Sequence, residues 1–144
     1  MEKDILRLNQ LLQSGKCCAQ ALVILGTELQ GQKNPQMEAA SAALCLGVRS
    51  GLTCGALTGG AMMMCLFDSA QAASELIPEL VEWFKETYEE SYGGIDCDAI
   101  LAGNPANKAF RCPALVENTY RKARELLEDA GFDFEELSEN LEEV

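Results

Sequence analysis

The sequence predicts an all-α protein, a single-domain helical bundle of about six to eight helices over residues 1–144. Apolar residues recur at the three- and four-residue spacing of amphipathic helices, and the alternating pattern of strands is scarce. Helix-starting prolines and helix-ending glycines divide the chain, and no internal repeat or low-complexity linker separates it into parts. A chain of 144 residues is also the size of one domain that can bury a core without cross-links.

The first half of the chain contains four predicted helices. In the first, Ile5, Leu8 and Leu12 share one apolar stripe. The third begins with Asn34 as its N-cap and Pro35 as its first helical residue, which are the residue types favoured at those positions. The four predicted helices span residues 4–15, 17–30, 34–47 and 53–67.

The predicted helix 53–67 lies within a stretch, residues 50–67, that carries no charge. Gly51, Gly55 and Gly59 give it a small-xxx-small pattern, so a membrane helix has to be considered. Its glycines and threonines make it only weakly apolar, and no aromatic belt or basic flank accompanies it. We therefore expect the central buried helix of the bundle, with a glycine face that lets a neighbouring backbone or a bound group come close.

The second half contains four further predicted helices. Pro78 fits the first turn of a long amphipathic helix, and Pro113 and Gly131 open and close another. An acidic C-terminal helix follows, with Asp133 and Glu136 spaced like a capping box. Its apolar stripe contains Phe134, Leu137, Leu141 and Val144, and its acids form either a solvated face, which we favour, or a partner-binding surface. These helices span residues 74–94, 97–103, 112–131 and 132–144.

The charge balance excludes several function classes. The net charge is −12, from 23 acidic and 11 basic residues, which argues against nucleic acid and against anionic membrane surfaces as partners. The chain contains no histidine, which removes His-ligated zinc, haem and the usual general base. The first residues, MEKDILRLNQ, are charged and helical in pattern rather than leader-like, so we expect a cytoplasmic chain with reduced thiols.

Four of the seven cysteines fall at predicted helix starts: Cys18, Cys54, Cys97 and Cys112. A helix N-terminus carries partial positive charge and unpaired N–H donors, which favour thiolate over thiol. The same donors can hydrogen-bond to the sulfurs of an anionic cluster. If the four helix starts converge, they form a site for a negatively charged thiolate assembly, to which Arg49 could add positive charge.

The remaining cysteines, Cys17, Cys45 and Cys65, are interpreted as small buried side chains of the core. The spacing of the other four matches no ferredoxin or zinc-ribbon pattern, and the chain contains no Cys-x-x-Cys. Spacing alone therefore does not identify the chemistry of the site.

Four segments resemble, in the same order, the C-GCAxxG-C-C family, whose members are described as redox-active. GKCCAQAL is similar to the family's Gly-x-x-Cys-Ala-Gln-Ala stretch, which selects Cys18 rather than Cys17. TCGALTGG resembles its Cys-Gly-Ala-x-x-Gly segment and gives Cys54, Gly55 and Gly59. FKETYEESYGGIDC and RCPALVENTYRKARELL resemble the last two segments, which contain Cys97 and Cys112.

The resemblance covers about residues 12–128, most of the chain. Family members often carry a glycine-rich run before the second cysteine, which is reduced here to LGVRSG, so a loop at the site is expected to differ. Some relatives join this domain to haem-binding parts, but this chain has neither histidine nor a Cys-x-x-Cys-His motif, which excludes haem. The resemblance implies a four-cysteine redox site without naming a reaction.

Three functions remain open at this stage. The first is a redox carrier or accessory protein in which Cys18, Cys54, Cys97 and Cys112 bind a [2Fe–2S] or [4Fe–4S] cluster, with Gly55, Gly59 and Arg49 around it. The second is a metal-free protein in which the same thiols exchange with disulfides. The third is a structural zinc site in a non-enzymatic interaction bundle. A redox partner protein is expected for the first two, and the chain could also form a homodimer.

Overall fold

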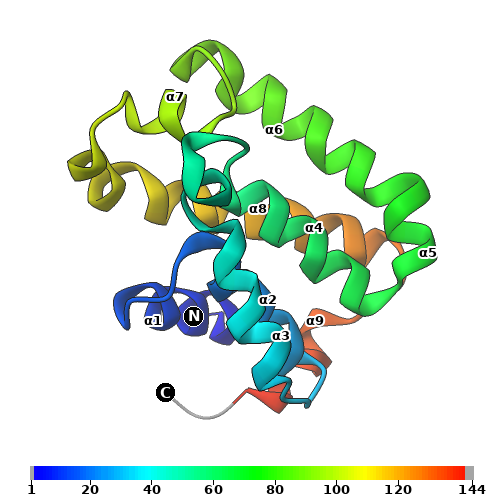
Figure 1. Ribbon diagram of the computed structural model, residues 1–144. Coiled ribbons are helices and arrows are strands. Elements are labelled where there is room, and N and C mark those ends of the chain that lie inside the picture. Colours follow the sequence, from blue (N-terminus) through cyan, green and yellow to red (C-terminus); the bar gives the residue numbers. More distant parts are fainter. Residues whose placement is uncertain (1, 142–144) are drawn as a thin grey trace.

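The computed structural model describes residues 2–141 and confirms the all-α class (Figure 1). Within these residues, seven α-helices have five or more residues, inside the predicted range. They are α1 (Lys3–Gln13), α2 (Cys18–Leu29), α3 (Pro35–Ala40), α4 (Gly55–Phe67), α6 (Ile77–Tyr92), α7 (Cys97–Leu101) and α8 (Lys108–Asp129), and the shorter α5 (Ser69–Gln71) and α9 (Phe134–Leu137) complete the set.

Helix α4 is the central helix, as its lack of charge predicted. It packs against α2, α6 and α8, and most of its residues are buried (Figure 1). Met63 and Met64 are fully buried within it, in one apolar cluster with Leu22, Leu80 and Tyr120 from the three surrounding helices. Among the described residues, none of the helices combines the length and the apolar character that crossing a membrane would require.

The glycine face of α4 receives the backbone of α2. A Cβ atom on Gly59 would lie 2.6 Å from the Cα of Ala19, and one on Gly55 would lie 3.5 Å from the amide nitrogen of Ala19. Real Cβ atoms do not approach backbone atoms as closely as 2.6 Å, so a side chain at Gly59 would push the helices apart. The group that the glycine face accommodates is therefore the first turn of α2.

Several predicted helix ends are confirmed. The Asn34 side chain accepts a hydrogen bond from the amide of Met37 (3.1 Å), with Pro35 as the first residue of α3. Pro78 is the second residue of α6. Gly131 follows the end of α8 with φ of +106°, a left-handed conformation in which glycine is unstrained. These local signals work because each satisfies a backbone group or dihedral without help from the rest of the fold.

The predicted start of α8 was wrong. The helix begins at Lys108, so Cys112 lies in its second turn and Pro113 lies inside the helix rather than at its first position. The true entry is Asn104–Pro105, where the Asn104 side chain accepts a hydrogen bond from the amide of Ala106 (3.0 Å) and a 3-10 turn leads directly into α8. The Asn-Pro pair is the same signal that starts α3, and it takes precedence over Pro113.

The C-terminal segment is not the single acidic helix predicted over residues 132–144. Asp133 caps α9 as predicted, by accepting from the amides of Glu135 and Glu136, but α9 ends at Leu137 and a 3-10 turn follows. The segment folds back because Phe134 and Leu141 are buried and Asn140 donates to the carbonyl of Leu29 (2.7 Å). The predicted stripe residue Val144 lies outside the described residues.

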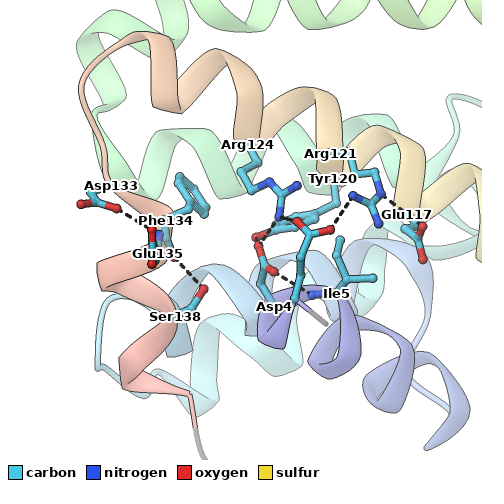
Figure 2. Close-up of polar contacts among 11 residues, drawn as sticks. Asp4, Ile5, Glu117, Tyr120, Arg121, Arg124, Asp133, Phe134, Glu135 and Ser138 are labelled. Atoms are coloured by element: carbon cyan, nitrogen blue, oxygen red, sulfur yellow. Dashed lines mark hydrogen bonds and ion pairs between the residues drawn. The ribbon is translucent and has the colours of Figure 1, made fainter.

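Helix α8 is tied to α1 by a buried polar network (Figure 2). The hydroxyl of Tyr120 donates to Asp4 Oδ2 (2.6 Å), and Arg124 pairs with the same oxygen (2.8 Å). Asp4 Oδ1 accepts from the amide of Ile5 (3.0 Å), so both carboxylate oxygens of this 2 %-exposed residue have partners. The burial of the carboxylate is compensated by its cation and hydrogen bonds, which fixes α1 on α8.

Candidate functional site

The four predicted site thiols lie near one another at the end of the bundle where α2, α4, α7 and α8 meet. Cys18 interacts electrostatically with Cys112 and Cys54, and Cys97 interacts with both Cys112 and Cys54. Cys18 and Cys97 are the first residues of α2 and α7, and Cys54 is the N-cap of α4. Three of the four thiols therefore lie at helix starts, and the fourth comes from the second turn of α8.

A short extended pairing brings Cys54 and Cys97 together. Thr53 and Asp96 form an isolated antiparallel bridge. The amide of Cys97 donates to the carbonyl of Leu52 (2.6 Å), and the amide of Cys54 donates to the carbonyl of Ile95 (3.2 Å). These two backbone hydrogen bonds hold α7 against the segment that enters α4, which Figure 1 shows as neighbouring parts of the chain. Nothing in the sequence pattern marks this pairing, because it involves only three residues on each side.

Cys18 and Cys112 form a hydrogen-bonded pair between α2 and α8. The Cys18 thiol donates to the Cys112 sulfur, which lowers the pKa of Cys112 to about 7 and raises the pKa of Cys18. Burial raises the pKa of Cys18 further, and Lys108 lowers that of Cys112 by its positive charge. The pair therefore holds one thiolate at Cys112 and one proton at Cys18 near neutral pH.

Burial has the opposite effect on the other two thiols. It raises the pKa of Cys54 to about 12, although the nearby backbone amides of Ala56 and Leu57 partly oppose the shift. Burial also raises the pKa of Cys97. The expectation that helix starts would favour thiolates was therefore wrong for three thiols. Desolvation raises the pKa of Cys54 and Cys97, and the interaction with Cys112, followed by burial, raises the pKa of Cys18. The thiol with the lowered pKa, Cys112, is the one that lies inside its helix.

A pocket of about 410 Å³ opens beside the Cys18–Cys112 pair. Both cysteines contribute to its wall, and both are partly exposed. Lys16 and Lys108 also line it. The sulfur with thiolate character is therefore reachable by a small molecule from solvent. The sequence contained one signal for this pocket, the Asn104–Pro105 turn, which places residues 105–109 opposite the start of α2.

Of the other predicted site residues, Gly55 lies at the thiols, whereas Gly59 and Arg49 lie elsewhere. Gly55 lies against both the Cys18 side chain (3.6 Å from its ideal Cβ) and the carbonyl of Leu44 (3.2 Å), so it shapes the floor under the thiols. Gly59 contacts the backbone of Ala19, one turn away. Arg49 is exposed, and its Nε donates to the carbonyl of Ala42 (3.1 Å). The cation beside the thiols is Lys108, which the sequence analysis did not select.

Arg49 belongs to a loop with an uncommon backbone. Leu46, Val48 and Arg49 have φ between +55° and +59°, and Gly47 and Gly51 also have positive φ. This left-handed conformation suits glycine and costs other residues about 1–2 kcal/mol each. The loop is the segment LGVRSG, in which two glycines and three other residues adopt this conformation.

Cys17 and Cys45 were wrongly taken as unpaired core residues, because the structure joins them as a disulfide with Cα atoms 5.8 Å apart. The bond connects the N-cap of α2 to the residue that ends the 3-10 turn after α3. Cys65 packs against the core as expected. Cys17 and Cys18 are adjacent in sequence but have different sulfur partners, so the disulfide anchors the start of α2 while the neighbouring thiol pairs with α8.

Within residues 2–141, no group of three or more Cys, Asp or Glu side chains is arranged so that it could hold a metal ion. The donor set itself, four thiols from four separate helices, is the number and type of ligand that an iron–sulfur cluster takes.

The fold and the site define a class of protein: an all-α, cysteine-rich domain in which three of the four site thiols lie at helix starts. A family model with the description "Putative redox-active protein (C_GCAxxG_C_C)" matches residues 16–126, most of the chain, so this chain belongs to that family. The match confirms the resemblance stated from the four cysteine segments. No curated protein and no solved structure matches this chain.

Proposed function

We propose that Cys18 and Cys112 form a redox-active dithiol that exchanges electrons with disulfides. The observation that carries this proposal is the position of Cys18 and Cys112 beside each other in the wall of an open pocket. A low-pKa, accessible thiolate next to a second thiol is the arrangement used in thiol–disulfide exchange. Family membership supports redox chemistry as the class of function.

The reaction begins when the Cys112 thiolate attacks one sulfur of a disulfide R–S–S–R′. A Cys112–S–S–R mixed disulfide forms, and R′–S⁻ leaves. Cys18 then gives up its proton and attacks the Cys112 sulfur. The Cys18–Cys112 bond forms, R–S⁻ leaves, and the proton from Cys18 returns to one of the two released thiolates. The dithiol loses two electrons, and the substrate disulfide gains them and leaves as one thiol and one thiolate. Excess thiol R–SH reverses both steps and restores the dithiol.

The roles of the two cysteines follow from their surroundings. Attack requires thiolate at neutral pH, which the lowered pKa of Cys112 provides. Cys18 keeps its proton until the mixed disulfide forms, because an unmodified Cys112 accepts its hydrogen bond. Once Cys112 is in a mixed disulfide, its negative charge is gone and Cys18 no longer has that acceptor. Cys54 and Cys97, both buried with raised pKa, are poorly suited to attack.

The test maps disulfides before and after oxidation. Cys17 and Cys18 share one tryptic peptide, between Lys16 and Lys33, so a Cys17→Ala/Cys45→Ala variant is used, in which Cys18 is that peptide's sole cysteine. We expect oxidation with a small disulfide to link this peptide to the one that begins at Cys112, and excess thiol to release it. A Cys65→Ser variant serves as a control and should behave like the parent. Oxidised protein in which Cys18 and Cys112 are both still free would refute the proposal.

A second function, binding of an iron–sulfur cluster, is favoured by a separate observation: Cys54 and Cys112 each interact electrostatically with the other three site thiols. Cys18, Cys54, Cys97 and Cys112 would be its ligands, with Gly55 beneath them. When bound, such a cluster supplies one-electron transfer. Cys54 distinguishes this function from the first, because the exchange reaction does not use it.

Metal and acid-labile sulfide analysis of anaerobically purified protein, with an absorption spectrum, separates these functions. Iron and sulfide that are lost in Cys54→Ser would establish the cluster. Zinc without sulfide would instead identify a structural site, and chelation would then unfold the protein. If the protein lacks both metals and Cys54→Ser retains the Cys18–Cys112 exchange, the dithiol proposal stands and the cluster proposal fails.

A further inference from the structure

We propose that the pocket beside Cys112 selects small disulfides, and the thiols derived from them, whose side groups carry carboxylates. This inference rests on the proposed function, since it names the substrate class of the same dithiol. Its basis is separate, namely the size of the pocket and the charges that line it.

The charges around the pocket are opposite to those of the molecule. The chain has 23 acidic and 11 basic residues, yet the lining contains two lysines and no acidic residue. Lys16 lies two residues before Cys18, and Lys108 lies four residues before Cys112, one helical turn away on the same face of α8. Lys108 is close enough to act electrostatically on Cys18, Cys97 and Cys112. A carboxylate next to the reacting sulfur would therefore meet a cation on either side.

The rest of the lining is apolar. Leu12 comes from α1, Pro105 from the turn before α8, and Ala109 and Pro113 from α8 itself. These side chains can contact the methylene groups of a short aliphatic thiol, while the lysines contact its charged end. The volume of about 410 Å³ is in the range of small-molecule pockets. The geometry therefore fits a short, anionic thiol compound better than an extended loop of a protein.

The experiment uses three small disulfides of similar size that differ in charge: 3,3′-dithiodipropionate (anionic), bis(2-hydroxyethyl) disulfide (neutral) and cystamine (cationic). The rate of mixed-disulfide formation at Cys112 is measured for the reduced full-length chain, and each rate is divided by that of the same disulfide with free 2-mercaptoethanol. We expect the anionic compound to react about fivefold faster than the neutral one, since one charge pair near 4 Å in water contributes about 1 kcal/mol. The preference should shrink as ionic strength rises.

Substitution of the lysines identifies the source of the preference. Lys16→Gln and Lys108→Gln should each lower the ratio of anionic to neutral rates, and the double variant should bring it to one or below, since the net negative charge then acts alone. The ratio is used because any change in the thiolate fraction of Cys112 cancels in it. Lys85→Gln, an exposed residue on α6, is the matched control and should keep the parent ratio.

Three outcomes count against the proposals, and they can be told apart. If none of the three disulfides modifies Cys112, the proposed function itself fails. If all three react with the same normalised rate, or if cystamine reacts fastest as the net charge of −12 alone would predict, the dithiol function stands and the substrate class is wrong. If the anionic preference survives the double lysine substitution, the pocket is not its source and the inference is overturned.

Discussion

The two halves of α8 are both tied to the N-terminal part of the chain by polar side chains, and the two ties differ in kind. Tyr120 and Arg124 bind the buried carboxylate of Asp4 on α1 through charged hydrogen bonds (Figure 2). Near the other end, Cys112 accepts a hydrogen bond from Cys18 on α2. In the first tie, both oxygens of the buried Asp4 carboxylate have hydrogen-bond partners. In the second tie, the Cys112 thiolate lies beside an open pocket.

The difference shows how one helix can serve stability and reactivity separately. A carboxylate with a cation and hydrogen bonds is inert and expensive to disturb, since removal of one partner leaves the others buried without compensation. A thiol pair is weakly bonded, because sulfur is a poor donor and acceptor, and a reagent can reach it. We therefore expect substitutions at the Asp4 network to change the free energy of unfolding, and substitutions at the thiol pair to change rates.

The largest expected effect is on alkylation at the thiol pair. Cys112→Ser should reduce the rate of modification by iodoacetamide at pH 7 by about 100-fold, because the remaining thiols are mainly protonated or buried. The measurement is mass spectrometry of the alkylated protein against time. Tyr120→Phe, at the other tie, should leave this rate unchanged. A rapid reaction that persists in Cys112→Ser would mean that another thiol is the nucleophile.

At the Asp4 network we expect a change in stability and no change in the alkylation rate. Asp4→Ala leaves the buried Tyr120 hydroxyl without its acceptor and removes one partner of Arg124. The free energy of unfolding should fall by about 3 kcal/mol, measured by urea denaturation. The alkylation rate of Cys112 in native conditions should stay at the parent value. If Cys112 becomes faster or slower by several fold, the two ties are coupled through α8 and are not separate.

Gly59→Ala tests the contact between α2 and α4 that supports the thiol pair from the other side. Its Cβ would lie 2.6 Å from the Cα of Ala19, so α2 must shift and stability should fall by about 2 kcal/mol. Because Cys18 precedes Ala19, formation of the Cys18–Cys112 disulfide should also slow. Gly131→Ala, outside the contact, meets open space and should lose stability through its backbone dihedral without affecting disulfide formation.

The pH dependence of alkylation examines the hydrogen bond itself. Thiolate is the deprotonated form, so the rate should rise with pH, with a midpoint at the Cys112 pKa of about 7. Cys18→Ala removes the donor, and the midpoint should move up toward the ordinary cysteine value near 8.5, which lowers the rate at pH 7 roughly tenfold. Cys18→Ser keeps a donor and should hold the midpoint low, although it cannot form the disulfide. Equal midpoints in Cys18→Ala and the parent would mean that the hydrogen bond has no role.

The smallest expected effect concerns the left-handed loop before α4. Val48 is β-branched and has φ of +59°, so Val48→Gly relieves strain and should raise the free energy of unfolding by about 1 kcal/mol. The midpoint of urea denaturation shows whether the variant is more or less stable than the parent. Because Val48 is exposed, its loss from the loop removes little packing. Destabilisation would show that contacts of Val48 outweigh the backbone strain.

The sequence predicted the elements that local chemistry determines. Local backbone requirements explain the helix ends at Asn34–Pro35, Gly131 and Asp133, since each residue provides a hydrogen bond or a dihedral angle within one turn. The uncharged α4 was predicted to be central because an apolar helix of this length is buried on all sides. The start of α8 was misplaced because two signals competed, and Asn104–Pro105, which supplies both a cap and a turn, prevails over Cys112–Pro113.

At the site, the sequence identified the four thiols but not how they differ. Their helix starts suggested thiolates, whereas the depth of burial that raises the pKa of Cys54 depends on neighbours from other helices. The Cys17–Cys45 bond and the cation Lys108 also depend on how separate elements meet. Spacing along one chain carries no information on such distances, so the roles of Cys18 and Cys112 required the fold.

The two sides of the thiol pair differ in how freely they can adapt. On the α2 side, Gly59 and Ala19 leave no side-chain atoms that could rotate to absorb a displacement. On the α8 side, the contact with α4 includes the side chain of Thr119, which lies 3.5 Å from the ideal Cβ position of Gly60. When a bond between Cys18 and Cys112 forms or breaks, we therefore expect α8 to shift more readily than α2. Oxidation would then displace α8 slightly, while α2 and α4 keep their positions relative to each other.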